Sequence, residues 1–138
     1  TRLALEPSFI AASCEDLLPE ELEKLGEYRV YNQEYVENRT CIVQSGEFFV
    51  KDIDLHLFLY SLPKNKFFER ISTMALTRCI IARAGIYNRM KTVHSDVAAF
   101  HLQILDALAA RDRQAVETAM REHLSSTRDN LVNYYTRT

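Results

Sequence analysis

The sequence predicts an all-α fold, a single antiparallel bundle of helices. Three observations lead to this prediction. The chain of 138 residues is long enough for one domain, and 47% of it is hydrophobic, which suffices for a core. It contains only three Gly and three Pro, so residues that interrupt helices are rare. Apolar residues recur at helical spacing in stretches separated by short connections, and we find no convincing strand and no internal repeat.

The first half of the chain predicts three helices. Apolar residues at helical spacing favour a short helix from residue 1 to about 12, which ends at the break over residues 16–19. A second helix is expected over 20–38, with Pro19 suited to its first turn. A third helix is expected over 47–62 and is apolar almost all round. It should therefore be buried on most of its sides.

The second half predicts three more helices. The fourth should run over 66–91 and turn one apolar stripe toward the core. The fifth should begin after a cap at Ser95 and end near residue 110, and the sixth should begin after a cap at Asp112 and end near 135. The residues of the fourth stripe are Phe67, Ile71, Met74 and Ile81.

Charge and composition limit the classes of function. The formal net charge of −2 makes this chain a poor candidate for gripping a phosphate backbone by itself. We see no apolar run long enough to span a membrane and no export signal, which favours a cytoplasmic protein. The three cysteines, Cys14, Cys41 and Cys79, are widely spaced and lack a CxxC pair, so we expect reduced thiols.

Polar residues on the apolar stripes are the main functional signal. Asp52 and His56 are four positions apart, so they share one face of the most apolar helix. His101 and His123 lie on the inward stripes of the fifth and sixth helices. Imidazole and carboxylate groups are ordinary ligands of divalent metals, and bundle cores can hold such sites. The alternative is a set of hydrogen-bonded core residues without a metal. The fourth histidine, His94, is expected to be exposed and without a role.

Two arginines and one asparagine are candidates for binding a ligand. Arg78 falls on the predicted stripe of the fourth helix, and Arg2 falls on that of the first. A buried arginine needs an anionic partner, which is either an internal acid such as Glu6 or the carboxylate of a ligand. Asn65 precedes the fourth helix, so it either caps that helix or reaches the site.

Several motifs together resemble a known family. They are Asp52-Ile-Asp-Leu-His56, Pro63-Lys-Asn65, His101-Leu-Gln-Ile-Leu-Asp-Ala-Leu, Ala110-Arg-Asp112, Ala119-Met-Arg-Glu-His123-Leu and the opening Arg2-Leu-Ala-Leu-Glu6. In this order they resemble the ligand-sensing C-terminal (FCD) domain of bacterial GntR-type transcription regulators of the FadR subfamily. The resemblance covers nearly the whole chain. Two departures are Leu55, where the family usually has Phe, and Leu62-Pro63-Lys64, which replaces a small Ala-Ser-Gly.

The resemblance implies a bundle of six or seven helices that encloses a metal-containing cavity. By matching positions, Asp52, His56, His101 and His123 would hold a divalent metal, with Zn²⁺ first and Ni²⁺ or Mn²⁺ as alternatives. A small organic acid would complete the coordination. Arg78 matches a recurrent arginine of the family, and with Arg2 and Asn65 it would bind this effector.

The resemblance also implies an assembly. Residues 1–138 would form the effector-binding and dimerisation domain of a homodimer. A winged helix-turn-helix domain, expected upstream and absent from this chain, would bind DNA. No contact with a membrane is expected.

Two other functions are considered. A helical-bundle metalloenzyme would use the same ligands to activate water, but it needs a separate general acid or base. The nearest extra carboxylate, Asp54, lies about 200° around the helix from Asp52, on another face. The other alternative is a dimerisation bundle that binds no ligand. The sequence therefore favours a sensor domain over an enzyme.

Overall fold

The computed structural model describes residues 1–37, 45–84 and 94–136, and over these ranges the chain is entirely helical apart from short connections. The all-α prediction is confirmed. The elements are α1 (Arg2–Ser13), the short 3-10 helix η1 (Cys14–Asp16), α2 (Pro19–Glu37), α3 (Ser45–Ser61), α4 (Lys66–Ala84), α5 (His94–Ala109) and α6 (Arg113–Thr136).

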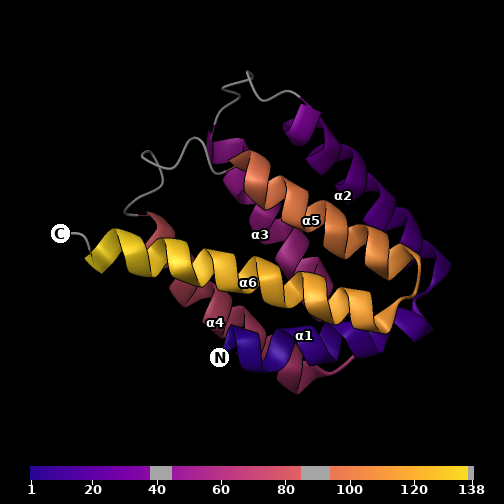
Figure 1. Ribbon diagram of the computed structural model, residues 1–138. Coiled ribbons are helices and arrows are strands. Elements are labelled where there is room, and N and C mark those ends of the chain that lie inside the picture. Colours follow the sequence, from indigo (N-terminus) through magenta and orange to yellow (C-terminus); the bar gives the residue numbers. More distant parts are fainter. Residues whose placement is uncertain (38–44, 85–93, 137–138) are drawn as a thin grey trace.

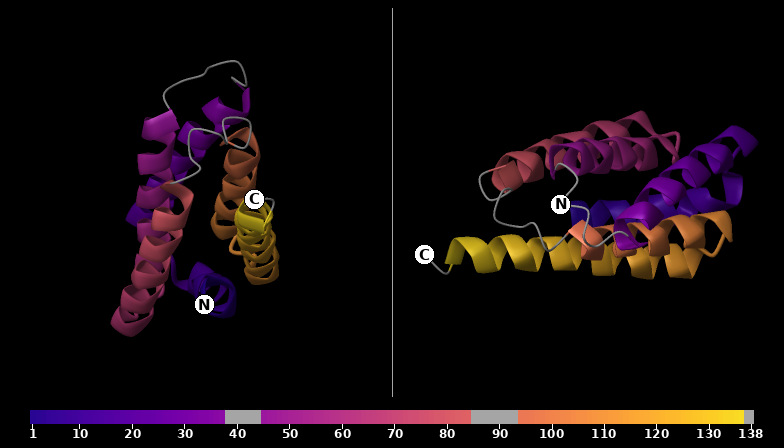
Figure 2. Two further views of the ribbon diagram at one scale, coloured as in Figure 1. Left: turned by 90° about the vertical axis from the view of Figure 1, so that its left-hand side faces the viewer. Right: turned by 90° about the horizontal axis from the view of Figure 1, so that it is seen from above.

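The helices form two layers that face each other. Helices α3 and α4 run side by side in one layer, and α5 and α6 form the opposite layer (Figures 1 and 2). Helix α2 packs along α5, while α1 contacts both α6 and α4 and so closes one end of the space between the layers. The layers bring α3, α5 and α6 together, and these are the helices that carry the predicted ligands.

The predicted helix ends agree closely with the structure. Asn65 caps α4, since its Oδ1 accepts a hydrogen bond of 3.0 Å from the backbone N–H of Phe68. Asp112 caps α6 in the same way, with a 3.1 Å bond from the N–H of Ala115. Helix α5 begins at His94, so Ser95 lies inside the helix and does not precede it. The expected extension of the fourth helix to residue 91 lies outside the described residues.

Two connections contain residues with a left-handed backbone. Lys64, between α3 and α4, has a φ of 57°, and Arg111, between α5 and α6, has a φ of 54°. The guanidinium of Arg111 donates to the carbonyl oxygens of Cys14, Glu15 and Leu17 at 3.0–3.1 Å. One side chain therefore holds the connection after α1 against the turn that joins α5 to α6.

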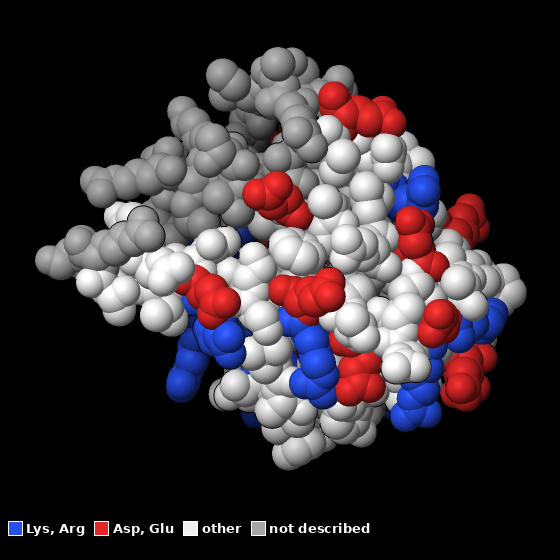
Figure 3. All heavy atoms as spheres, in the orientation of Figure 1, with Lys and Arg blue, Asp and Glu red and all other residues white. Residues whose placement is uncertain are grey.

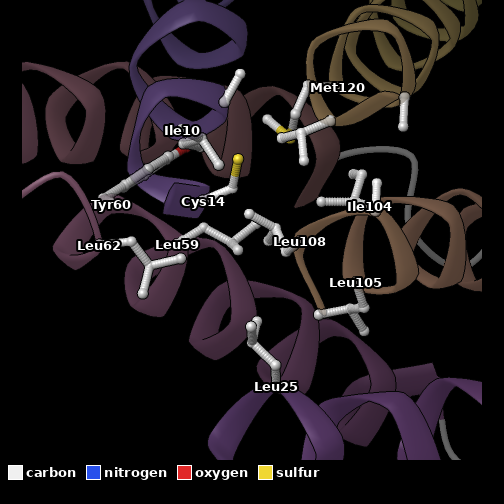
Figure 4. Packing of buried hydrophobic residues seen from close by; sticks show 14 of the residues in the cluster. Ile10, Cys14, Leu25, Leu59, Tyr60, Leu62, Ile104, Leu105, Leu108 and Met120 are labelled. Atoms are coloured by element: carbon white, nitrogen blue, oxygen red, sulfur yellow. The ribbon is translucent and has the colours of Figure 1, made fainter. Parts of the chain in front are cut away.

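An apolar core fills the end of the bundle near α1. Each of the helices α1 to α6 contributes side chains to it, and Cys14 lies among them (Figure 4). Several members have no exposed surface, among them Ile10, Leu59, Leu108 and Met120. Burying such side chains contributes about 1.5–3 kcal/mol each. This core holds α3, α5 and α6 in register beside the polar cluster described below. Cys14 and Cys79 are free thiols.

The predicted inward face of α4 is wrong. Phe67, Met74 and Ile81 are 75%, 57% and 70% exposed, whereas the buried residues of α4 are Phe68, Ser72 and Leu76. Arg78, which shares the expected stripe, is therefore exposed too.

The physical reason is that apolar residues lie on both faces of this helix, so two stripes about 100° apart fit the pattern equally well. Helix α3 also departs from the expectation of burial on most sides, because Val50 is 56% exposed and Leu57 39% exposed.

Acidic and basic side chains are interspersed on the face formed by α5 and α6 (Figure 3). This face therefore lacks the concentrated positive charge that binds a phosphate backbone. Among the described residues, no helix combines the length and the apolar character needed to cross a membrane.

Candidate metal centre

The structure brings together all four side chains predicted as metal ligands. Asp52 and His56 lie one turn apart on α3 and face inward, while His101 comes from α5 and His123 from α6. The four residues are 1–3% exposed. The ring centroid of His56 lies 5.4 Å from that of His101 and 5.3 Å from that of His123, and the other two centroids are 4.9 Å apart. We call these four residues the central cluster.

The ligand atoms of the central cluster converge. One nitrogen from each of the three imidazoles lies within 4.8 Å of the others. Asp52 Oδ1 is 3.2 Å from His56 Nε2 and 3.0 Å from His101 Nε2. Neither Asp52 Oδ1 nor His101 Nε2 has a hydrogen-bond partner of acceptable geometry, although both atoms are buried. Buried polar atoms without partners are costly, and a shared cation would satisfy these two together.

The outer nitrogen of His101 has a defined partner. His101 Nδ1 lies 2.9 Å from Asn32 Oδ1 on α2, and Asn32 Nδ2 donates to the carbonyl oxygen of Tyr28 at 2.8 Å. The amide of Asn32 is oriented by this second bond, because a carbonyl oxygen only accepts. In a neutral His101 this contact favours the tautomer with the proton on Nδ1, in which the Nε2 lone pair faces Asp52 Oδ1.

His56 has a different environment on its outer side. Nη2 of Arg2 lies 3.3 Å from His56 Nδ1, and a guanidinium only donates. In the neutral imidazole the proton is then on Nε2, which lies 3.3 Å from His123 Nε2. A metal bound at His56 Nε2 would require this proton to leave or move to Nδ1. If the proton moved to Nδ1, the contact between Arg2 and His56 would have to change, because both atoms would then be donors.

Arg2 belongs to a buried polar network beside the central cluster. Its Nε donates to Glu6 Oε1 at 2.7 Å, and the hydroxyl of Tyr60 donates to the same oxygen at 2.5 Å. Glu6 has no exposed surface. The internal ion pair between Arg2 and Glu6, one of the two predicted roles of Arg2, is thus present. Burial and the nearby carboxylate raise the pKa of Tyr60, which stays protonated.

Arg83, and not the exposed Arg78, is the arginine of α4 that contacts the central cluster. Its Nη1 donates to Asp52 Oδ2 at 2.8 Å, and its guanidinium lies over the ring of Phe49. Asp52 therefore binds an arginine through one oxygen and turns the other toward the imidazoles. Asn65 is exposed and serves as the cap of α4, so the structure gives it no contact with the central cluster.

The central cluster shifts the pKa values of its members. Burial, together with the positive charge of neighbouring groups, lowers the pKa of His56 and lowers that of His123 strongly. Burial alone would raise the pKa of Asp52, but the neighbouring imidazoles of His101 and His56 outweigh burial and hold this pKa well below its ordinary value. The chain thus presents an ionised carboxylate and two neutral imidazoles near pH 7. These are the protonation states that metal binding requires.

The donor set fits a divalent metal of the Zn²⁺, Ni²⁺ or Mn²⁺ class. Three imidazole nitrogens and one carboxylate oxygen are ordinary ligands for these ions. Buried atoms without a partner in the described chain include Asp52 Oδ1, His101 Nε2 and His123 Nδ1, and all three belong to the central cluster. In this structure the imidazole rings and Phe48 pack closely around the centre, and the enclosed cavity stays a prediction.

Three residues of this region were not predicted from the sequence. They are Asn32, Arg83 and Tyr60, and each contacts a member of the central cluster or a partner of one. Arg83 lies on the same helix as Arg78, at a position that the competing stripe would have selected. Asn32 and Tyr60 lie in no motif. Only their spatial neighbours reveal their roles.

Comparisons with known proteins identify a family for this chain. The FCD domain model matches residues 1–126. The "HTH-type transcriptional repressor NanR" of Citrobacter rodentium is 27% identical over 126 residues, which are 91% of this chain and 46% of that protein. The proteins of the same name from Escherichia coli K12 and Shigella flexneri are 26% identical over the same shares. No solved structure matches at comparable significance.

The chain spans about half the length of the curated relatives it matches. The family model, in contrast, covers nearly all of it, including the four residues of the central cluster. The chain therefore belongs to the FCD domain family.

Proposed function

We propose that this chain is the effector-sensing domain of a bacterial GntR-family transcription regulator, which binds a divalent metal and a small organic acid. The observation that carries the proposal is the convergence of three buried imidazoles beside Asp52, together with the buried atoms Asp52 Oδ1, His101 Nε2 and His123 Nδ1, which lack partners. FCD family membership and the repressor names of the relatives support the regulatory role. Asp52, His56, His101 and His123 would hold the metal.

The chemistry around the central cluster favours an anionic effector. Four protein ligands leave one or more coordination positions of the metal for a carboxylate oxygen. Arg83 uses one N–H for Asp52, and a guanidinium has five, so others can meet a ligand carboxylate. Arg2 offers a second positive charge beside His56. Arg83 thus replaces Arg78 as the effector-binding arginine of the fourth helix.

Regulation would follow from a difference in affinity. If the acid binds one arrangement of the helices 100-fold more tightly than another, about 2.7 kcal/mol is available to shift the population. In a homodimer this shift would reorient winged helix-turn-helix domains outside this chain, and these would bind DNA in the bacterial cytoplasm. The relatives, whose names include "HTH-type", are about twice as long as the matched region.

The metalloenzyme alternative is not supported. The chain belongs to a family of regulatory domains, and its relatives are named as transcriptional repressors. The other alternative, a dimerisation bundle without a ligand, gives no reason for a carboxylate and three imidazoles to converge in the core.

Metal and acid titrations test the proposal. The chain is stripped with chelator and titrated with Zn²⁺ by calorimetry, and melting temperatures are then measured with and without lactate, glycolate or malonate. At 100 times the dissociation constant, Zn²⁺ should add about 2.7 kcal/mol, which raises the melting temperature by about 10 °C. An acid should raise it further only in the Zn²⁺-loaded chain. His101→Gln is the control and should lose both responses. A wild-type chain that binds no divalent metal would overturn the proposal.

A further inference from the structure

Asn32 is a buried polar residue that links a helix without metal ligands to the central cluster. It lies in the middle of α2 and is 2% exposed. Asparagine is unfavourable inside a helix, and burying its amide is costly unless partners are present. Here both ends of the amide have partners, since Oδ1 meets His101 Nδ1 at 2.9 Å and Nδ2 donates to the carbonyl of Tyr28 at 2.8 Å.

The contact of Asn32 with Tyr28 determines how Asn32 can contact His101. The Tyr28 carbonyl can only accept, so it selects the orientation in which Nδ2 points to it and Oδ1 points to His101. The Oδ1 atom of Asn32 can also only accept a hydrogen bond, so it selects the tautomer of His101 that has its proton on Nδ1. The remaining nitrogen, Nε2, then has a free lone pair, and it is the atom that lies 3.0 Å from Asp52 Oδ1.

This arrangement has a consequence for the ion that the central cluster can accept. Two acceptor atoms 3.0 Å apart repel each other unless a positive charge lies between them or beside both. Asn32 prevents neutral His101 from relieving the repulsion by placing its proton on Nε2. The fixed tautomer therefore keeps the pair in the form that a cation stabilises.

We propose that Asn32 is a positioning residue of the metal centre, which holds His101 in the Nδ1–H tautomer and so presents Nε2 to a divalent metal. The proposal rests on the metal binding proposed above. Outer partners of ligating histidines commonly fix the ring and its tautomer, and their loss weakens metal binding by about 10–100-fold. Asn32 provides this function from α2, 69 residues away from His101 in the chain.

Two substitutions separate this role from a purely structural one. Asn32→Leu is similar in size but removes both the acceptor and the donor. Asn32→Asp keeps an acceptor for His101 Nδ1–H and removes the donor to the Tyr28 carbonyl. If Asn32 positions His101, Asn32→Leu should bind Zn²⁺ about 10–100-fold more weakly, while Asn32→Asp should stay within about threefold of wild type. If only the bond to Tyr28 matters, both variants should lose stability and affinity together, which would overturn the proposal.

The matched control is Gln33→Leu. Gln33 is the next residue of α2, and its amide donates to Glu37 on the same helix. This variant should bind Zn²⁺ as the wild type does. The absorption spectrum of the Co²⁺-loaded protein gives a second readout, since it should change in Asn32→Leu and be restored in Asn32→Asp. If wild type and Asn32→Leu give equal affinity and the same spectrum, the role of Asn32 is overturned while metal binding by the central cluster stands.

A measurement without metal tests the tautomer directly. Long-range ¹H–¹⁵N NMR of the chelator-treated wild-type chain at pH 8 should show His101 protonated on Nδ1. A proton on Nε2 would overturn the proposal whether or not the variants fold. If the wild-type chain binds neither Zn²⁺ nor Co²⁺, the proposed function falls and the proposal for Asn32 falls with it, whatever tautomer is found.

Discussion

Arg83 and Asp52 form a partly buried ion pair that joins α4 to α3, with Nη1 of the arginine 2.8 Å from Oδ2 of the aspartate. The side chain of Asp52 is 2% exposed and that of Arg83 15%. The pair leaves Oδ1 of the same carboxylate directed toward the imidazoles. Arg83 therefore both compensates the charge of Asp52 and fixes which oxygen faces the central cluster.

Arg83→Met should destabilise the metal-free chain. The buried carboxylate loses its cationic partner, which commonly costs about 3 kcal/mol. Urea unfolding in the presence of chelator measures this difference. Arg78→Met is the matched control, because Arg78 is an exposed arginine of the same helix and its loss should change the free energy of unfolding by less than about 0.5 kcal/mol. Equal effects of the two substitutions would contradict the assignment of Arg83.

The metal-free chain should lose stability as the pH falls below about 6.5. The folded state lowers the pKa of His56 and His123, so the unfolded chain binds protons first on acidification and is favoured. Each group contributes up to about 1.4 kcal/mol per pH unit until its folded form also titrates. The lowered pKa of Asp52 adds a further loss below about pH 4.

Urea unfolding at pH 7.5, 6.5 and 5.5 measures this profile. The variant His123→Leu retains only one of the two shifted imidazoles, so its slope should be about half that of wild type. A wild-type stability that does not change between pH 7.5 and 5.5 would show that these imidazoles are not held neutral.

His123→Leu should separate stability from metal binding. Nδ1 of His123 is buried without a partner, so an apolar side chain should leave the metal-free chain at pH 8 as stable as wild type or up to about 1 kcal/mol more stable. The same substitution should abolish stabilisation by Zn²⁺. Melting curves with Zn²⁺ and with chelator measure both effects.

The matched control for this experiment is Ser72→Ala. Ser72 Oγ on α4 is also buried without a partner, but it lies outside the central cluster. This variant should share any gain in stability and keep the full response to Zn²⁺. If His123→Leu also keeps that response, His123 is not a ligand.

The free energy of unfolding should depend on which residue replaces Arg111. Its side chain donates to three backbone carbonyls near the end of α1, and its φ of 54° suits glycine better than alanine. Arg111→Gly should lower the free energy of unfolding by about 2 kcal/mol through the lost hydrogen bonds. Arg111→Ala should lower it by about 1 kcal/mol more because of the left-handed backbone. Arg113→Ala, at an exposed neighbour, is the control for urea unfolding and should change little.

Sequence periodicity predicted the helices, and it also singled out the four side chains that the structure brings together as the central cluster. A polar side chain on an otherwise apolar stripe is costly to bury, so Asp52, His56, His101 and His123 stood out wherever the stripe was unambiguous. The caps at Asn65 and Asp112 were equally local signals, and both are confirmed.

The same reasoning failed where two stripes compete. In α4 the neighbours Phe67 and Phe68, and likewise Ile80 and Ile81, place apolar side chains on two faces. Packing against α1 and α3 selects one face, and this selection buries Phe68 and exposes Phe67. No local sequence pattern could reveal the role of Asn32, because its partner His101 lies 69 residues away on another helix.

The contact between Arg2 and His56 joins residues 54 positions apart and reaches from the first turn of α1 to the middle of the bundle. A doubly positive ion at the imidazoles would repel that guanidinium, whereas Glu6, one turn further along α1, would continue to attract it. The opening turn of α1 is therefore subject to a force that depends on what the bundle has bound. A metal ion bound at the imidazoles would thus act, through its repulsion of the Arg2 guanidinium, on the first turn of α1.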